Sequence, residues 1–280
     1  MIISVASGKG GTGKTTVAAN LANSLANSAI LDCDVEEPNV HIFLNPVINK
    51  TEKVNVFNPL ISDEKCTKCG ICANICEFNA LVKIPNNILF FPDLCMSCEA
   101  CMELCPENAI TKLDKTVGEI NLGKTDSNID FVNGILEIGV PRAIPVIEAV
   151  KEQINSQKIV ILDAPPGTSC PVIETISNSD YCILVTEPTP FGLYDLKIAV
   201  EVVRLLKIPF GVIINKFGMV ENSLIEDFCK KEDIDILLKI PFERKIAEAY
   251  SKGKLLVQIY PEWKDKFQTL YQEISEKVKQ

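Results

Sequence analysis

SGKGGTGKTT, residues 7–16, contains the pattern GxxxxGK[ST] from Gly8 to Thr15. In this pattern the glycines let backbone N–H groups curl around phosphate oxygens. The apolar run of residues 1–6 precedes it as a short buried strand, and residues 14–27 follow with apolar side chains at helical spacing. A helix N-terminus adds a positive dipole end that favours phosphate. The sequence therefore predicts a phosphate-binding loop between a strand and a helix.

The loop predicts a nucleotide and a magnesium ion as ligands. Lys14 is placed to reach the β- and γ-phosphates, and the Thr15 hydroxyl is placed to ligate Mg²⁺. The expected cofactor-binding residues of the loop are Gly8, Lys9, Gly10, Gly11, Thr12, Gly13, Lys14, Thr15 and Thr16. An ordinary phosphate loop does not require Lys9, for which a solvated loop charge is the plain alternative.

KGGTGKTT, residues 9–16, resembles the deviant Walker A loop of the MinD/ParA group of ATPases. That group includes the nitrogenase iron protein, arsenite-pump ATPases and Mrp-type iron–sulfur carriers. The resemblance covers nearly all of the chain outside a cysteine-rich segment. It implies that Lys9 acts in trans, on the nucleotide of a partner copy in a homodimer.

Two carboxylates and a glycine follow from the same resemblance. Asp34 comes after a strand at 29–33, at the position where the family has an Asp that orients the attacking water. Two solvated Asp residues at a strand end are the alternative. Asp163 ends another apolar strand and resembles the Walker B residue that supports Mg²⁺, and Gly167 resembles the glycine that senses the γ-phosphate. The expected catalytic residues are Lys9, Lys14 and Asp34.

Two later positions are expected to bind the base. Asn215 matches a family position that reads the base, although a capping Asn in a loop is the alternative. A GTPase would follow Asn-Lys with x-Asp, whereas Phe217 and Gly218 follow here, which favours ATP over GTP. Pro241 begins a segment that resembles the family's loop against adenine, though Ile-Pro before a helix is also common as plain structure.

The cysteine-rich segment is an internal repeat. CTKCGICANICEFNAL from Cys66 and CMSCEACMELCPENAI from Cys95 align without gaps at an offset of 29 residues. Two CxxCxxCxxxC runs are typical of a bacterial-type ferredoxin with two [4Fe–4S] clusters, in which the fourth cysteine of each run ligates the other cluster. The predicted ligand sets are Cys66, Cys69, Cys72 and Cys105 for cluster one, and Cys95, Cys98, Cys101 and Cys76 for cluster two. Zinc is the alternative metal, since CxxC pairs also bind Zn²⁺.

Four cysteines lie outside the repeat: Cys33, Cys170, Cys182 and Cys229. Three of them lie in strand-like or helical runs and are expected to be buried. Cys170 follows Asp163 by seven residues, in the expected switch region. In the nitrogenase iron protein a cysteine at this offset holds a cluster shared across the dimer, but residues 131–147 offer no second cysteine. Redox activity or target contact by Cys170 stays open.

The order of expected elements predicts an α/β fold: a mostly parallel, doubly wound P-loop NTPase sheet with an inserted bacterial-type ferredoxin domain. The ATPase domain is expected at residues 1–59 and 116–280, and the insert at 60–115. Expected strands are 2–6, 29–33, 159–163, 181–186, 210–214 and 236–240, and expected helices are 14–27, 143–155, 191–206, 221–232 and 262–278.

Composition excludes some classes of partner. The net charge of −9 disfavours nonspecific binding to nucleic acid or anionic lipid. The chain has no apolar run of about 20 residues, so no membrane span is expected, and the absence of a signal segment predicts a cytoplasmic location. The last helix has an apolar face but no basic excess, so it is expected to pack against the domain rather than to anchor in a membrane.

Three functions agree with these features. The leading hypothesis is a homodimeric Mg·ATP-dependent ATPase that gates electron transfer through two [4Fe–4S] clusters to a protein or metallocofactor partner. Similar ATPases with an inserted ferredoxin domain are associated with small NifX-like metal-cofactor proteins, which suggests the partner. The alternatives are an iron–sulfur cluster carrier of Mrp type, and a MinD-like positioning protein with sensory clusters.

Overall fold

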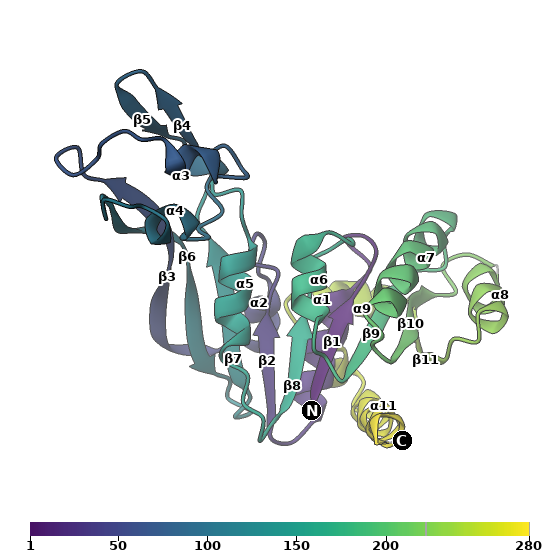
Figure 1. Cartoon of the computed structure of the whole chain (residues 1–280). Coiled ribbons are helices and arrows are strands. Elements are labelled where there is room, and N and C mark those ends of the chain that lie inside the picture. The colour runs from purple at the N-terminus through teal and green to yellow at the C-terminus, as the bar shows by residue number, and fades with distance from the viewer. Residues whose placement is uncertain (222, 280) are drawn as a thin grey trace.

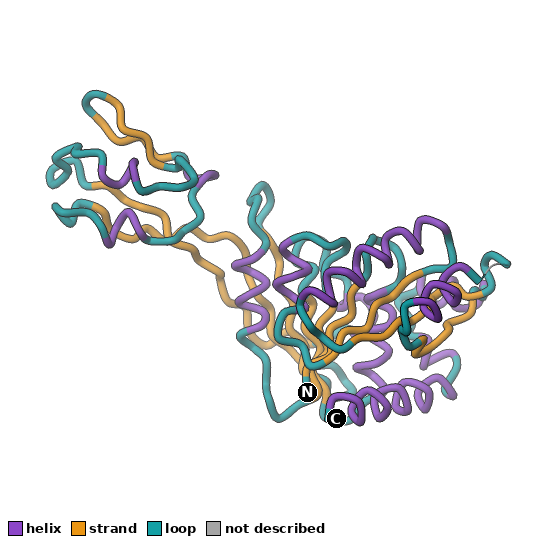
Figure 2. Tube along the Cα trace, turned by 45° about the vertical axis from the view of Figure 1, so that its right-hand side comes forward, coloured by secondary structure: helices purple, strands orange, loops and turns teal. Residues whose placement is uncertain are grey.

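The computed structural model describes residues 1–221 and 223–279. It consists of a layered α/β body and a smaller lobe that projects beyond one edge of the body's sheet (Figures 1 and 2). Within the described residues the body has one nine-stranded sheet. Its strands lie in the order β11 (Ile236–Pro241), β10 (Phe210–Phe217), β9 (Tyr181–Thr186), β1 (Ile2–Ala6), β8 (Ile159–Asp163), β2 (Ser28–Asp32), β7 (Asp130–Leu136), β6 (Ile110–Lys124) and β3 (Val47–Ile61).

The sheet from β11 to β7 is parallel, and β6 and β3 extend it in antiparallel pairing. The strands around β1 are apolar on both faces because helices cover both sides of a parallel sheet. The carboxyl ends of parallel strands meet at one edge, which is where ligands bind in such folds. The prediction of a mostly parallel doubly wound sheet is confirmed.

Helices cover both faces of the sheet (Figure 1). The core on one face joins β1 to α1 (Lys14–Ser24), α2 (Val40–Leu44), α9 (Arg244–Tyr250), α10 (Leu256–Ile259) and α11 (Glu262–Val278). The other face holds α5 (Ile144–Lys151), α6 (Cys170–Ile176), α7 (Pro190–Leu205) and α8 (Leu224–Lys231).

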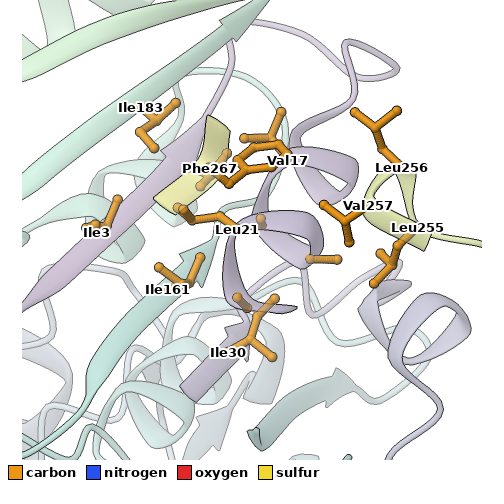
Figure 3. Close-up of a cluster of buried hydrophobic side chains, with 14 of the residues drawn as sticks. Ile3, Val17, Leu21, Ile30, Ile161, Ile183, Leu255, Leu256, Val257 and Phe267 are labelled. Atoms are coloured by element: carbon orange, nitrogen blue, oxygen red, sulfur yellow. The ribbon is translucent and has the colours of Figure 1, made fainter. Parts of the chain in front are cut away.

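The first of these cores explains the position of α11. Phe267 is fully buried and lies among Leu21 of α1 and Ile3 of β1 (Figure 3). Trp263, Leu270 and Ile274 are buried on the same face of the helix. The expectation that the last helix packs against the domain is confirmed.

The projecting lobe is carried by the hairpin of β3 and β6. These strands pair from Val47 with Lys124 to Ile61 with Ile110, whereas β7 pairs with β6 only from Gly118 to Lys124. The far half of the hairpin therefore extends beyond the sheet. It holds α3 (Ile71–Asn74), β4 (Leu81–Ile84), β5 (Asn87–Phe90), a 3₁₀ turn at Pro92–Leu94 and α4 (Ala100–Glu103), with a small core of their own.

The six expected strands and five expected helices are present, with boundaries that differ by a few residues. The helix expected at 14–27 ends at Ser24, and that expected at 143–155 ends at Lys151. The helix expected from 221 begins at Leu224, and residue 222 of that expectation lies outside the described residues. Strands β3, β6 and β7 were not expected. The proposed domain boundaries fall inside β3 and β6, and their positions stay predictions.

Candidate functional site

The glycine loop connects β1 to α1 at the carboxyl edge of the sheet. Gly13 precedes the first turn of α1 with φ +96°, a backbone region that favours glycine. A Cβ at Gly8 would lie 2.2 Å from the Asp195 carbonyl oxygen of α7, and one at Gly13 would lie 2.2 Å from Asn215 Nδ2. These two glycines are therefore required by close approach of other elements, which fixes the shape of the loop.

The end of β10 holds the loop from the other side. Asn215 Nδ2 donates a hydrogen bond to the Thr12 carbonyl oxygen at 2.8 Å. Lys216 Nζ donates to the Gly11 carbonyl oxygen at 3.1 Å. These two bonds use carbonyl oxygens of the loop and leave its backbone N–H groups for a phosphate. Asn215, expected from the sequence to read a base, thus also positions the loop.

A cavity opens beside the loop and contains both residues expected to contact the base, Asn215 and Pro241. Its cavity volume is about 340 Å³, within the lower part of the size range of small-molecule sites. Gly11, Gly13 and Thr16 form its floor on the loop side, and Phe242, Ile246 and Tyr250 give it apolar walls. The cavity therefore suits an aromatic base attached to phosphates held by the loop.

Thr15 and Asp163 form the candidate magnesium site. Thr15 Oγ1 donates to Asp163 Oδ2 at 2.6 Å. Asp163 is 1% exposed, and its Oδ1 is buried without a hydrogen-bond partner. Burial raises the pKa of Asp163 to about 7, although the Thr15 hydrogen bond and Lys14 oppose this. A hydroxyl beside an unpartnered carboxylate oxygen is the hard oxygen donor set that Mg²⁺ prefers, so these residues fit the ion.

Three carboxylates surround Lys14. The ammonium group is largely buried, which lowers its pKa, while Asp163, Asp34 and Asp32 raise it. Burial likewise raises the pKa of Asp34 to about 6, with Lys14 opposing. Asp34 therefore lies close to the residues expected to hold phosphate and magnesium, as the family resemblance implies.

Asp32 has a structural role that the sequence did not reveal. Its carboxylate is fully buried and accepts hydrogen bonds from the backbone N–H groups of Asn39 at 2.9 Å and Val40 at 3.0 Å. These bonds fix the first turn of α2.

Gly167, the expected phosphate sensor, lies directly against the glycine loop. Its N–H donates to the Ser7 carbonyl oxygen at 3.1 Å.

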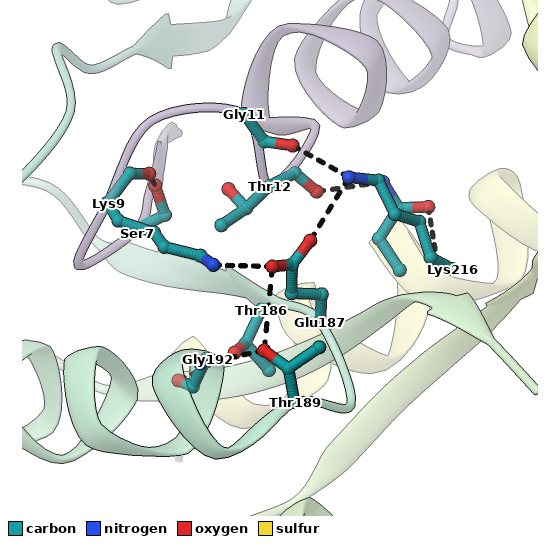
Figure 4. Close-up of polar contacts among 10 residues, drawn as sticks. Ser7, Lys9, Gly11, Thr12, Thr186, Glu187, Thr189, Gly192 and Lys216 are labelled. Atoms are coloured by element: carbon teal, nitrogen blue, oxygen red, sulfur yellow. Dashed lines mark hydrogen bonds and ion pairs between the residues drawn. The ribbon is translucent and has the colours of Figure 1, made fainter. Parts of the chain in front are cut away.

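Glu187 was not expected at the site. It follows β9 and forms ion pairs with Lys9 and with Lys216, the latter at 3.0 Å (Figure 4). Burial acts to raise the pKa of Glu187, but hydrogen bonds from both lysines outweigh it and lower that pKa. In this single chain Lys9 is thus held in cis, and its action in trans stays a prediction. The sequence did contain one signal for Glu187: it is an acidic residue near the end of a buried strand, as Asp34 and Asp163 are.

The eight cysteines of the insert surround two cavities. Cys66, Cys69, Cys72 and Cys105 line one, together with Ile61 and Ile110 of the hairpin. Cys76, Cys95, Cys98 and Cys101 line the other, beside Phe57 and Pro59. The structure therefore brings together the same two sets of four that the sequence predicts, with the fourth cysteine of each run in the other set.

The surroundings of these cysteines fit cluster thiolates. The backbone N–H groups of Ala80 and Ala109 each donate to a sulfur at 3.3 Å, that of Cys76 and of Cys105 respectively. Burial raises the pKa of the Cys101 thiol to about 11, so ligation by a metal would release a proton there. Within residues 1–221 and 223–279 no three His, Cys, Asp or Glu side chains converge on a single-ion site. Ligation of clusters by these cysteines stays a prediction.

Comparison with known proteins decides the family. The family described as the CobQ/CobB/MinD/ParA nucleotide binding domain matches residues 3–257. The chain belongs to this family. Its larger part is accordingly a P-loop ATPase domain of the MinD/ParA type, as the deviant Walker A loop predicts.

Relatives and structural neighbours agree with this assignment. An uncharacterized protein of Methanocaldococcus jannaschii is 33% identical over 265 residues, which is 91% of this chain and 90% of that protein. The iron-sulfur cluster carrier protein of Pyrococcus abyssi is 24% identical over 90% of this chain and 77% of its own length. The septum site-determining protein MinD of Pyrococcus horikoshii, complexed with Mg-ADP, has a TM-score of 0.59 at 21% identity, over 98% of this chain and 95% of that one. This last likeness shows the fold.

The burial expected for three of the cysteines outside the insert is confirmed. Cys33, Cys182 and Cys229 are buried, and Cys170 is exposed at the start of α6.

None of the helices in the described residues combines the length and apolar character that crossing a bilayer requires.

Proposed function

We propose that this MinD/ParA-family protein is a homodimeric Mg·ATP-dependent ATPase that controls electron transfer through two [4Fe–4S] clusters in its insert. The observation that carries the proposal is the partition of eight cysteines into two cavities of four, in a chain whose body holds a nucleotide-binding cavity next to the glycine loop. When bound, each cluster supplies one-electron transfer. The electrons come from a reduced donor protein and pass to a protein or metallocofactor acceptor, for which a NifX-like protein is the suggested class.

The nucleotide site supports hydrolysis of ATP to ADP and phosphate. Lys14 and the loop N–H groups hold the β- and γ-phosphates, and Thr15 and Asp163 hold Mg²⁺. Asp34 orients the attacking water, and Lys9 of the partner copy neutralises the charge that develops on the transferred phosphoryl group. Lys9 must leave Glu187 to do so, which makes release of this ion pair part of the ATP-bound state.

Coupling requires that ATP bind two conformations of the protein with different affinity. The test is an EPR-monitored redox titration of anaerobically purified protein with no nucleotide, with Mg·ADP and with a non-hydrolysable Mg·ATP analogue. We expect the midpoint potential or line shape of at least one cluster to depend on the nucleotide. A Lys14→Gln variant, which loses phosphate contacts, should give the same titration in all three conditions. Identical titrations of the wild type would refute gating.

A second candidate is a carrier that donates clusters to apo-proteins. The named iron-sulfur cluster carriers among the relatives favour it. The eight cysteines of the insert lie in two partly enclosed cavities, and outside the insert only Cys170 is exposed, so a transferable cluster would have to use Cys170 from two copies. Transfer of iron to an apo-ferredoxin that is lost in Cys170→Ser would support the carrier role.

A further inference from the structure

The insert contacts the rest of the protein through two routes. One is the β3–β6 hairpin, which enters it covalently at both ends. The other is a hydrogen bond from Arg142 Nη2 to Ser97 Oγ at 3.3 Å. Among the hydrogen bonds and ion pairs of the described residues, this one alone joins residues 62–109 to the chain beyond the hairpin. A cleft lined by residues of β3 and α5 and by Met96, Ser97 and Glu99 includes the contact.

Ser97 lies in the loop of cluster two. It stands between Cys95 and Cys98, two of the four cysteines around the second cavity. Ser97 has φ +58°, and its N–H donates to Cys95 Sγ at 3.4 Å. A change at the Ser97 hydroxyl therefore acts on a strained turn whose backbone is bound to a ligand sulfur. The guanidinium of Arg142 also places a permanent positive charge beside this set of thiolates.

The segment that leads to Arg142 is bound at its start to the chain next to Asp34. It lies between β7 and α5, at the carboxyl edge of the sheet. Leu136 N–H, at the end of β7, donates to the carbonyl oxygen of Val35 at 2.8 Å, and Val35 directly follows Asp34. Glu137 N–H donates to the Val117 carbonyl oxygen of the hairpin at 2.9 Å. A shift of the Asp34 segment on ATP binding would thus reach both the base of the hairpin and Arg142.

We propose that Arg142 is a positioning residue that transmits the nucleotide state from the Asp34 segment to the cluster-two loop through Ser97. The inference rests on the proposed function and adds the route and the cluster. Cluster two is the one that senses the nucleotide, because its loop touches Arg142. Cluster one is lined by Ile61 and Ile110 at the far end of the hairpin and serves as the outward partner of the relay.

The test compares full-length, cluster-loaded wild type with Arg142→Gln, Arg142→Lys and Ser97→Ala. The matched control is Arg204→Gln, which removes an exposed arginine of α7 that is paired with Glu232 and, within the described residues, has no hydrogen bond or ion pair to the insert. Hydrogen exchange of residues 95–101 and of residues 66–72 is measured without nucleotide, with Mg·ADP and with a non-hydrolysable Mg·ATP analogue. EPR potentials of both clusters are recorded in parallel.

For the wild type we expect exchange in residues 95–101 to differ by roughly fivefold or more between nucleotide states, the size of an ordinary coupling. Arg142→Gln and Ser97→Ala should abolish this difference while iron content and nucleotide affinity stay at the wild-type level. Arg142→Lys should restore part of it because the charge is kept, and Arg204→Gln should resemble the wild type.

The outcomes separate the two proposals. A nucleotide response in the wild type that persists in full in both Arg142→Gln and Ser97→Ala would overturn the role of Arg142 and leave gating intact. A wild type with no response at either cysteine loop, and with nucleotide-independent potentials, would overturn gating and the route together. A response confined to residues 66–72 would overturn the assignment of cluster two as the sensor.

Discussion

Glu187 binds two lysines at the mouth of the nucleotide site, although Lys9 lies 178 residues away in the sequence. Its side chain is 12% exposed, whereas those of Lys9 and Lys216 are 30% and 35% exposed, so solvent screens these ion pairs in part. The phosphates of a nucleotide offer the same negative charge to the same cations. Glu187 and the nucleotide therefore compete for Lys9 and Lys216.

This competition predicts the effect of Glu187→Gln. Loss of the carboxylate leaves two cations with only a neutral partner, so nucleotide phosphates should bind more tightly. A hydrogen bond to a charged group contributes about 1.5–3 kcal/mol, and we expect affinity for Mg·ATP to rise by about tenfold. Calorimetric titration measures it, with Glu201→Gln on the exposed side of α7 as the control. Unchanged affinity would show that the ion pairs do not oppose binding.

The buried carboxylates predict how stability depends on pH. The ordinary pKa of 3.8 rises to about 6 for Asp34 and about 7 for Asp163 in the folded chain, because of burial. Between the ordinary pKa and the raised pKa, each carboxyl holds its proton in the folded state and has lost it in the unfolded state. The free energy of unfolding therefore falls as pH rises from about 4 to about 7. In thermal unfolding of magnesium-free protein, the stability of Asp34→Asn should decline less with rising pH than that of the wild type. An equal decline would exclude Asp34 as its source, and added Mg²⁺ should stabilise the neutral-pH form.

At the scale of single elements, α11 stabilises the body through one face. Phe267 is fully buried against α1 and β1, while Gln272 on the same helix is exposed. Phe267→Ala should lower the free energy of unfolding by about 3–5 kcal/mol through lost burial and a cavity. Gln272→Ala should change it by no more than about 0.5 kcal/mol. Urea unfolding followed by circular dichroism tests both, and a small loss for Phe267→Ala would mean that α11 is dispensable for the core.

The crossing of the cysteine runs gives a second prediction for elements. Cys76 follows α3 and belongs to the first cysteine run, but it lies with Cys95, Cys98 and Cys101. Cys76→Ser should therefore disturb the same EPR signal as Cys98→Ser, and Cys105→Ser the other signal, while exposed Cys170→Ser changes neither. If Cys76→Ser instead affected the signal lost in Cys69→Ser, each run would bind its own cluster.

Local patterns made much of this fold and site predictable. The glycine loop and the cysteine repeats depend on spacing within short segments, so the sequence contains them whole. Strand β3 escaped prediction because, from Val47 to Lys53, it exposes nearly every side chain at the sheet edge, and β7 because buried Asn133 and Gly134 interrupt its apolar pattern. Glu187 follows a buried strand, but its ion pairs with Lys9 and Lys216 join segments distant in sequence, and so does the contact between Arg142 and Ser97. No local pattern reveals such pairs.

At the scale of the whole molecule, the chain leaves the body along β3 and returns along β6, its immediate neighbour in the sheet. Thr111 and Leu60, near the tip, are already paired across this hairpin. The two ends of the insert are thus held side by side by the ATPase body itself. The whole insert can therefore be exchanged at this point for a short turn or for another domain, without any change in the order of the strands. The β3–β6 hairpin is thus a position at which one ATPase fold can accept inserted domains of different kinds.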